Sequence, residues 1–241
     1  MDVDWIGEAV LTVGVGIFRG IVGDNKIHSH WAAQITIALN GECKFETADA
    51  GAFSTAAVFF RSGVKHRLIS GDVCSIYFDP TSAVFNDIVC DEPEKEWGEL
   101  HLSSELRAIA ESASLRAAID SEYLKESVSG PESDPRLAEV LERIRCEINS
   151  ESSSNRQTLA NSVGMSPTRF SHWFVEQLGI PMRSYKKWLK LRLAIDALLA
   201  GVPPIEAAQA AGFSDQAHMS RSFSQAFGIT YTNAKTALGK R

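Results

Sequence analysis

Three histidines in the first third of the chain are the side chains best suited to bind a metal ion or a polar ligand. His28 and His30 stand two residues apart in "HSHWAAQITIALNG", so on a β-strand they share one face, and Gln34 shares it too. His66 follows in "RSGVKHRL". Neutral imidazoles and an amide oxygen can bind zinc, iron, nickel or copper, although glutamine is a weaker ligand than glutamate. The same side chains could instead line an effector pocket or hydrogen-bond to one another inside the fold, and the sequence leaves all three interpretations open.

Short β-strands are predicted around these histidines, over residues 10–90. Apolar and β-branched runs separated by Gly, Asn and Asp indicate a small antiparallel sandwich or barrel: "AVLTVGVGIF", "AAQITIAL", "AAVFF" and "VCSIYF". From Ser103 to about Ser127, apolar residues recur every three or four positions, which predicts a helix. This helix would either cap the barrel or form a dimer interface through one stripe, made by Leu106, Ile109, Ala113 and Ala117.

Two later segments repeat each other about 48 residues apart. "GMSPTRFSHWFVEQLGIP" begins at Gly164 and "GFSDQAHMSRSFSQAFGIT" at Gly212, and each predicts a helix, a tight turn at the glycine and a second helix. The buried stripe of the second helix is predicted to be Phe170 and Phe174 in the first copy, and Met219 and Phe223 in the second. The outward side chains are Thr168, Arg169, Ser171 and His172, then Gln216, Ala217, His218, Ser220 and Arg221.

Local signals place the ends of these helices. Thr158, Ser166 and Ser214 are predicted N-caps, and Pro167 is predicted at a first helical position. "PRLAEVLERIRCEI" predicts an earlier helix that begins at Pro135, with one apolar face made by Leu137, Leu141, Ile144 and Ile148. Two polar stretches are predicted to interrupt the helices, at residues 127–135 and 149–155.

The repeated pattern is that of the helix-turn-helix, whose second helix lies in the major groove of DNA. The stretch between the copies, "YKKWLKLRLAIDALLAG", is amphipathic. About 15 of its residues in a helix would form a rod of about 22 Å, which could hold two recognition helices in successive grooves. Charge supports this interpretation. Residues 155–241 hold 11 Lys and Arg against 4 Asp and Glu, whereas residues 1–154 hold 13 against 26, although the whole chain carries −6.

Other sequence features suggest a cytoplasmic protein. No run of about 18 apolar residues could cross a membrane, and the acidic N-terminus is unlike a signal peptide. The four cysteines include no Cys-x-x-Cys pair, so we expect free thiols: Cys43, Cys74, Cys90 and Cys146.

Residues 135–241 resemble the DNA-binding domain of the AraC/XylS transcriptional regulators, through "LANSVGMSPTRFSHWFVEQLGIP", "YKKWLKLRLAIDALLAG" and "AAQAAGFSDQAHMSRSFSQAFGIT". The resemblance implies that Thr168, Ser171 and His172 contact bases. It also implies that three side chains of the second recognition helix face DNA: Gln216, His218 and Arg221. The chain departs from the family after "GIT", where Tyr231 replaces the usual proline and Ala234-Lys235 the usual Tyr-Arg.

The histidines, in turn, resemble the two motifs of the cupin barrel, in which three histidines and a glutamate point inward. Gln34 stands where the glutamate would be, and Arg61 stands where a proline would precede Gly63. Because AraC-type regulators often carry a cupin-like sensor domain, the two resemblances support each other.

Together these observations predict a two-domain α+β protein: a cupin-like antiparallel sensor domain (1–100), a helical dimerisation segment and linker (101–134), and a double helix-turn-helix domain (135–241). It would be a sequence-specific transcriptional regulator and not an enzyme. Double-stranded DNA, a second copy of the chain, an unidentified small-molecule effector and RNA polymerase are its expected or candidate partners. No cofactor is expected, and a divalent metal at His28, His30 and His66 is the exception to test. The alternatives are a metal-dependent cupin enzyme with a helical accessory domain, and a barrel that only dimerises or docks a partner.

Overall fold

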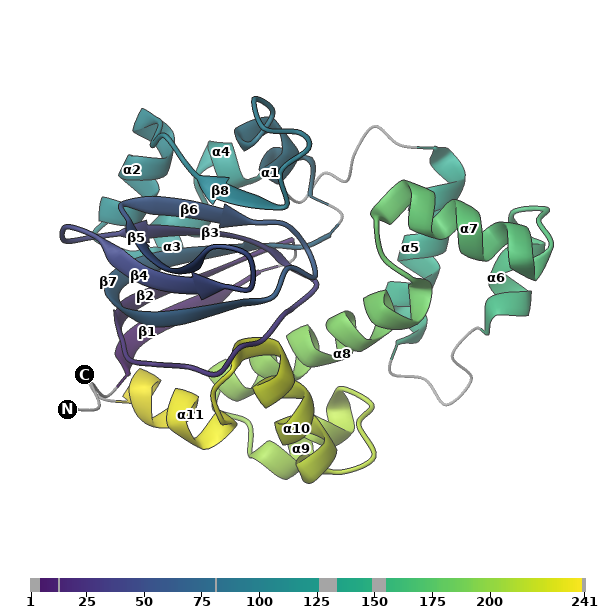
Figure 1. Cartoon of the computed structure of the whole chain (residues 1–241). Helices are drawn as coiled ribbons and strands as arrows, with labels where there is room; N and C mark the ends of the chain where they lie inside the picture. The colour runs from purple at the N-terminus through teal and green to yellow at the C-terminus, as the bar shows by residue number, and fades with distance from the viewer. Residues whose placement is uncertain (1–4, 13, 81, 126–133, 149–154, 240–241) are drawn as a thin grey trace. The chain divides into compact units, whose positions relative to one another are not determined.

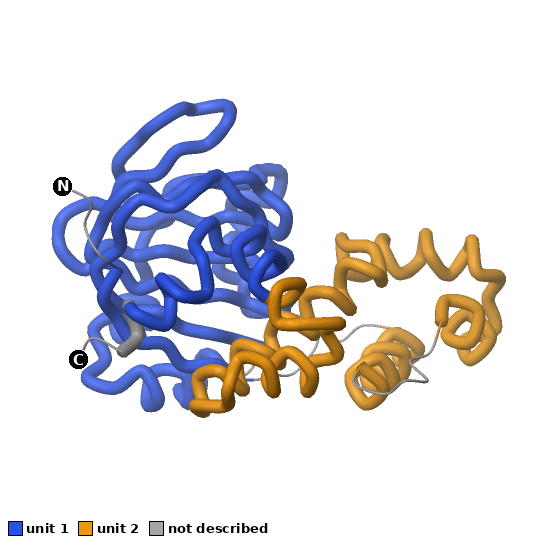
Figure 2. Tube along the Cα trace, turned by 90° about the horizontal axis from the view of Figure 1, so that it is seen from below, with its two compact units in different colours: residues 1–129, 220–241 blue, residues 130–219 orange. Residues whose placement is uncertain are grey.

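The structure is a computed structural model that describes residues 5–12, 14–80, 82–125, 134–148 and 155–239. It divides into two compact units (Figure 2), of which unit 1 comprises residues 1–129 and 220–241 and unit 2 comprises residues 130–219. The dividing point at Met219 falls inside a helix, so the last segment of the chain packs with the β-rich part. The domain limits predicted at 100 and 134 stay a prediction. The two predicted interruptions lie almost wholly outside the described residues.

Unit 1 is built on an antiparallel sheet (Figure 1), as the strand pattern predicted. The strand order is β1-β2-β7-β3-β6-β8, and β4 pairs with both β5 and β7. β7 is 13 residues long, so its first part can pair with β4 while its last part lies between β2 and β3. The strands are β1 (Ile6–Leu11), β2 (Val15–Val22), β3 (Ala33–Ala38), β4 (Cys43–Thr47), β5 (Gly51–Thr55), β6 (Ala57–Phe60), β7 (His66–Phe78) and β8 (Trp97–Glu99).

Alternation along the strands separates two cores. Ile35, Phe59 and Ile76 point to one face and pack with the short helices that follow the sheet. Val58 and Phe60 point to the other face and form a second core with β4 and the start of β7. Polar side chains at the intervening positions of β3 and β7, including Gln34, therefore lie on the second face.

The prediction of a single helix from Ser103 to about Ser127 is wrong. The segment instead forms α2 (Ser104–Glu111), α3 (Leu115–Ile119) and α4 (Glu122–Lys125), after α1 (Ala83–Ile88). New helices begin after serine residues, because Ser103 and Ser114 each accept an N-cap hydrogen bond, at the starts of α2 and α3. The predicted interface stripe is divided as well: Leu106 and Ile109 are buried in the core of unit 1, whereas Ala113 and Ala117 are exposed.

The later helices follow the predicted order closely: α5 (Pro135–Glu147), α6 (Arg156–Ser162), α7 (Pro167–Leu178), α8 (Met182–Leu199), α9 (Pro204–Ala210), α10 (Gln216–Phe227) and α11 (Tyr231–Gly239). Pro135 and Pro167 stand at the helix starts as predicted, and the whole predicted apolar face of α5 is buried. The turns of both copies hold glycine with positive φ, +67° at Gly164 and +71° at Gly212.

Two of the three predicted N-caps are wrong. Asn155 caps α6 by accepting from the backbone N–H of Thr158, so the helix starts two residues before Thr158. Ser166 caps α7 as predicted. In the second copy Asp215 Oδ1 accepts from the backbone N–H of His218, and this role falls to Asp215 instead of Ser214 because the second copy has one more residue before its helix.

The last helix completes unit 1, because α11 packs against β1, the edge strand of the sheet. All four cysteines are free, which confirms that prediction. Among the described residues, none of the helices combines the length and the apolar character needed to cross a membrane.

Candidate nucleic-acid interface and histidine cluster

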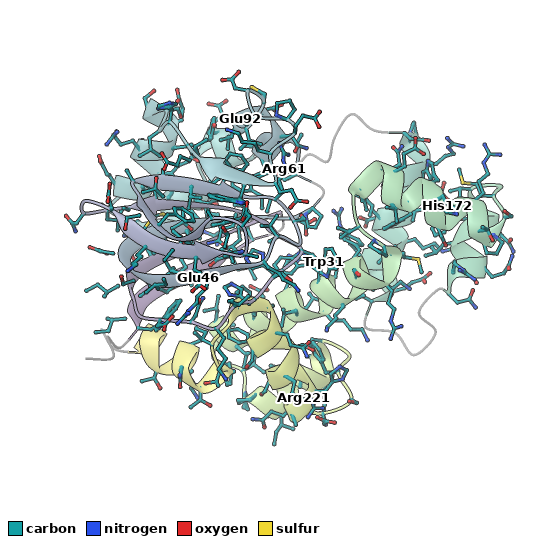
Figure 3. The ribbon with its side chains drawn as sticks, viewed as in Figure 1. Trp31, Glu46, Arg61, Glu92, His172 and Arg221 are labelled. Carbon is teal, nitrogen blue, oxygen red and sulfur yellow. The ribbon has the colours of Figure 1, made fainter. Side chains whose placement is uncertain are left out.

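α7 exposes the side chains that the sequence assigned to its outer face. Phe170 and Phe174 are fully buried, and this fixes the rotation of the helix. Thr168, Arg169 and His172 are consequently exposed, and His172 is marked in Figure 3. Ser171 is half-buried, and its hydroxyl donates to the carbonyl of Pro167, at 2.9 Å. Three of the four predicted side chains are thus fully available to a partner.

α10 repeats this arrangement in the second copy. Met219 and Phe223 are buried, at 1% and 9% exposure, as predicted. Four of the outward side chains are exposed and Ser220 is half-buried; the exposed ones are Gln216, Ala217, His218 and Arg221 (Figure 3 labels Arg221). The ring of His218 is oriented by a hydrogen bond of 3.1 Å between its Nδ1 and Ser214 Oγ.

Val175 is a surface residue of α7 that the sequence analysis did not single out. It is 40% exposed although it is apolar, and it lies three residues after His172 and four after Ser171, on the same helix face. An exposed aliphatic side chain beside polar ones can contact the methyl group of thymine. Its position one turn beyond His172 was the signal available in the sequence.

The structure brings together all four residues of the predicted histidine set. The ligand nitrogens of His28, His30 and His66 lie within 4.8 Å of one another, and all three residues are buried. Two backbone hydrogen bonds between His28 and His66, each 3.0 Å, hold the segment before β3 against the start of β7. Gln34 is 2% exposed and lies beside two of the rings. We call these four residues the histidine cluster.

The cluster is kept uncharged by its surroundings. Burial, together with the neighbouring His30, lowers the pKa of His28 to about 4. Burial likewise lowers the pKa of His30, and it lowers that of His66 well below the usual value. Neutral imidazoles are the forms that bind metals or accept hydrogen bonds.

A count of donors and acceptors shows what occupies the ring nitrogens. The Nδ1 atoms of His30 and His66 lie 2.8 and 3.0 Å from the carbonyls of Ala32 and Val64, so each Nδ1 carries the proton. Each Nε2 is then an acceptor, and the Gln34 carboxamide lies 2.9 Å from one and 3.1 Å from the other. In the structure Gln34 Oε1 faces both rings and Gln34 Nε2 donates to Thr36 Oγ1, at 2.7 Å. Exchanging the two amide atoms, which have nearly the same shape, would let the NH2 donate to both Nε2 atoms and the oxygen accept from Thr36 Oγ1. A glutamate could not donate to the rings in that exchanged orientation.

Two further residues near the cluster, Arg61 and Trp31, are structural. The guanidinium of Arg61 donates to the carbonyls of Lys95 and Glu92, at 2.8 and 3.1 Å, and so ties down the loop before β8 (Figure 3). Trp31 packs against Gly63, whose Cβ position would lie 3.4 Å from its ring. Neither side chain hydrogen-bonds to a member of the cluster among the bonds described.

Comparison with known proteins identifies the C-terminal helices. Residues 159–236 match a family described as a helix-turn-helix domain. They form an AraC-type helix-turn-helix domain. The AraC-type domain confirms the resemblance seen in the sequence, and such domains bind DNA. Residues 159–236 are therefore a DNA-binding domain of the AraC type.

The whole chain also shares its two-part fold with solved structures. ToxT from Vibrio cholerae O395 superimposes with a TM-score of 0.61 at 9% identity, covering 95% of this chain and 100% of ToxT. ToxT from strain SCE256 with a bound unsaturated fatty acid gives 0.57 at 12% identity, covering 100% and 99%. A third ToxT structure, bound to (E)-4-(8-methylnaphthalen-1-yl)but-3-enoic acid, gives 0.57 at 11% identity, covering 93% and 99%. At these identities the likeness shows the fold alone. No curated protein matches the chain.

Proposed function

We propose that the protein reads two successive major grooves of one DNA duplex with α7 and α10, and that its barrel responds to a small molecule. One observation carries the first half of this proposal. Two twelve-residue helices, each with a capped start and a buried apolar stripe, expose short polar and basic side chains at equivalent positions. Such side chains bond to base edges and phosphates.

The two helices would make different contacts. Arg169 and Arg221 can each reach a phosphate or the O6 and N7 atoms of guanine, whereas Thr168 and Gln216 suit shorter contacts to base edges. α8, with 18 residues, is a rod of about 27 Å between the two helix-turn-helix copies. A rod of this length is compatible with recognition helices about 34 Å apart.

DNA binding by the full chain is the direct test. We expect the association constant for a duplex selected from random DNA by the wild-type chain to fall steeply with salt, with a slope of about −0.9 for each phosphate contacted. His172→Ala and Arg221→Ala should each cost about 1–3 kcal/mol and relax base preference at separate positions. Arg116→Ala, which removes an exposed arginine of α3, is the matched control. Salt-independent binding, or unchanged base preference in both variants, would refute the assignment.

The sensing role of the barrel takes its support from two features. The histidine cluster places polar groups inside the sheet domain, and ToxT, with the same fold, is known with carboxylic acids bound. Unsaturated fatty acids are therefore the first probes for thermal stabilisation of this protein. Stabilisation that His30→Ala abolishes would place the effector at the cluster, and stabilisation unchanged by that variant would exclude it. Self-association and binding to RNA polymerase are separate parts of the proposal, each testable by sedimentation.

The alternative function is that of a metal-dependent enzyme, and the metal content of the purified protein tests it. The donor count favours a hydrogen-bonded cluster, because the Gln34 carboxamide already lies against two of the candidate ligand nitrogens. We expect protein purified without chelator to carry less than stoichiometric iron, nickel or zinc. Stoichiometric metal that disappears in the His28→Ala, His66→Ala double variant would instead support the enzyme.

A further inference from the structure

The start of α10 orients the ring of an exposed histidine. Asp215 Oδ1 accepts from the backbone N–H of His218, at 2.6 Å, and the hydroxyl of Ser214 donates to Asp215 Oδ2, at 3.2 Å. The same hydroxyl oxygen lies 3.1 Å from His218 Nδ1. The histidine ring also packs edge-on against the buried ring of Phe213, with the ring centroids 5.3 Å apart. His218 is therefore accessible to a partner, and its ring is held in place before any partner binds.

The hydrogen bonds of Ser214 determine which nitrogen of this ring carries a proton. A carboxylate only accepts hydrogen bonds, so the single hydroxyl proton of Ser214 points to Asp215. Toward His218 the hydroxyl oxygen can then only accept, so Nδ1 of the neutral ring carries the proton. Nε2, the other ring nitrogen, is consequently an acceptor. His218 differs in this respect from arginine and lysine, which offer only donors.

The first copy carries a different side chain at the same helix position. The third residue after the N-cap is Arg169 in α7, counted from Ser166, and His218 in α10, counted from Asp215. Both residues donate their backbone N–H to the cap side chain, at 3.3 Å for Arg169 and 2.6 Å for His218. Both side chains are exposed. The two copies therefore present a donor and an acceptor at equivalent positions.

We propose that His218 selects a base with an amino group in the major groove, adenine or cytosine, because Asp215 and Ser214 fix its ring as an acceptor. The inference rests on the proposed function in that α10 must lie in a major groove. Adenine N6 and cytosine N4 are the donors on the base edges there, whereas guanine O6 and thymine O4 are acceptors that would repel Nε2. Arg169, which has donors only, suits guanine. The equivalent positions of the two copies thus select bases of opposite hydrogen-bonding character.

Nitrogen NMR of the full chain tests the position of the proton without DNA. Protonated and unprotonated ring nitrogens of isotope-labelled histidine have distinct chemical shifts, and the signals of His218 are those missing from His218→Gln. At about pH 8.5, well above the usual pKa of histidine, we expect the form with the proton on Nδ1 to predominate. It should lose this majority in Ser214→Ala and keep it in Ser220→Ala, the matched control, which removes another hydroxyl of α10. A wild-type proton mostly on Nε2 would overturn the proposal.

A substitution outside the ring should move the proton. Asparagine caps helices about as well as aspartate does, so Asp215→Asn keeps the start of α10. Its oxygen can still accept from the backbone N–H of His218, but its amide nitrogen donates to Ser214 and frees the hydroxyl proton to point to Nδ1. We therefore expect the proton to be mostly on Nε2 in this variant. An unchanged proton position in Asp215→Asn would count against the role of the carboxylate.

Modified bases in the selected duplex test the link to DNA. The base pair that His218 contacts is the one at which His218→Ala relaxes base preference. Removing the amino group there, with purine in place of adenine or 2-pyrimidinone in place of cytosine, should weaken wild-type binding by about ten-fold. The same change should leave the affinities of His218→Ala and Asp215→Asn almost unaltered, and this comparison corrects for the weaker base pair.

The outcomes separate this inference from the proposed function. Equal losses of affinity in the wild type and in His218→Ala on removing the amino group would refute the role of His218. So would a His218→Ala variant that relaxes no position while Arg221→Ala relaxes its own, and either result would leave DNA binding by α10 in place. If the wild type binds no duplex, the proposed function and the base selection fail together, whereas the NMR spectra still decide the state of the ring.

Discussion

Replacing Gln34 by glutamate should reverse how the stability of the barrel depends on pH. In the folded wild type the histidine rings are neutral, so at acidic pH the unfolded chain binds more protons than the folded chain. The free energy of unfolding therefore decreases as the pH is lowered. For His28, with a usual pKa of 6.5 and a folded value of about 4, lowering the pH from 7.5 to 5 costs about 2 kcal/mol. His30 and His66 shift in the same direction and add to this loss.

The carboxylate of Gln34→Glu would lie where the amide now stands, about 3 Å from two ring nitrogens. At an effective dielectric constant of about 20 it would attract an imidazolium by about 5 kcal/mol. This attraction acts on His30 and His66, whose pKa values are lowered by burial, and it opposes that penalty. The variant should therefore hold a proton in the folded state, and this stabilisation is present below pH 6.5 and lost as the pH rises through the raised folded pKa.

Urea unfolding followed by tryptophan fluorescence at pH 5, 6, 7 and 8 measures both slopes. We expect the midpoint to rise with pH in the wild type and to fall with pH in Gln34→Glu. Gln209→Glu, which makes the same change at an exposed position of α9, should follow the wild type. Parallel slopes for the wild type and Gln34→Glu would show that a carboxylate at this position does not hold a proton on the rings, and would refute the prediction.

Three further outcomes are expected. Asp215 and Asn155 are the N-caps, so Asp215→Ala and Asn155→Ala should each destabilise their helix-turn-helix by about 1 kcal/mol in thermal unfolding. Thr158→Ala and Ser214→Ala should destabilise it by less. Phe174→Ala should cost about 3–5 kcal/mol because this ring is fully buried between α7 and α8, whereas Val175→Ala at the surface should cost under 1 kcal/mol in the same assay. Iodoacetamide should modify Cys90 and Cys146 in the native protein and leave Cys43 and Cys74 unmodified. The reason is that burial raises the pKa of the Cys43 and Cys74 thiols to about 12. Mass spectra of the labelled native protein that show all four cysteines modified would contradict this.

Local patterns in the sequence were sufficient to predict both recognition helices and the grouping of the histidines. Phe170 and Phe174 recur at helical spacing and are buried, so the opposite face of α7 is exposed as predicted. Three strands were not predicted individually: β4, β5 and β8. β4 alternates polar with apolar residues, and β5 and β8 are short, so none of the three has a long apolar run. The segment after Ser103 was predicted wrongly because its apolar spacing is helical while its serines cap new helices.

Contacts between distant positions could not be predicted from one sequence. Gly228 reads as an ordinary helix-ending glycine, the counterpart of Gly179, and only the fold reveals that Lys26 lies against it. The role of Gln34 was equally hidden, because its meaning depends on which atoms of His30 and His66 already face backbone carbonyls. Long-range partners of this kind are set by tertiary packing and leave no local periodicity.

The packing of α11 on β1 has a consequence for how the chain is made. During synthesis, the edge strand β1 is made more than 200 residues before α11, the helix that packs against it. Until that helix leaves the ribosome, β1 offers unpaired backbone groups to any neighbouring nascent chain, and uncovered strand edges of this kind promote aggregation. Premature termination before Tyr231 should therefore yield insoluble product even though every strand is present.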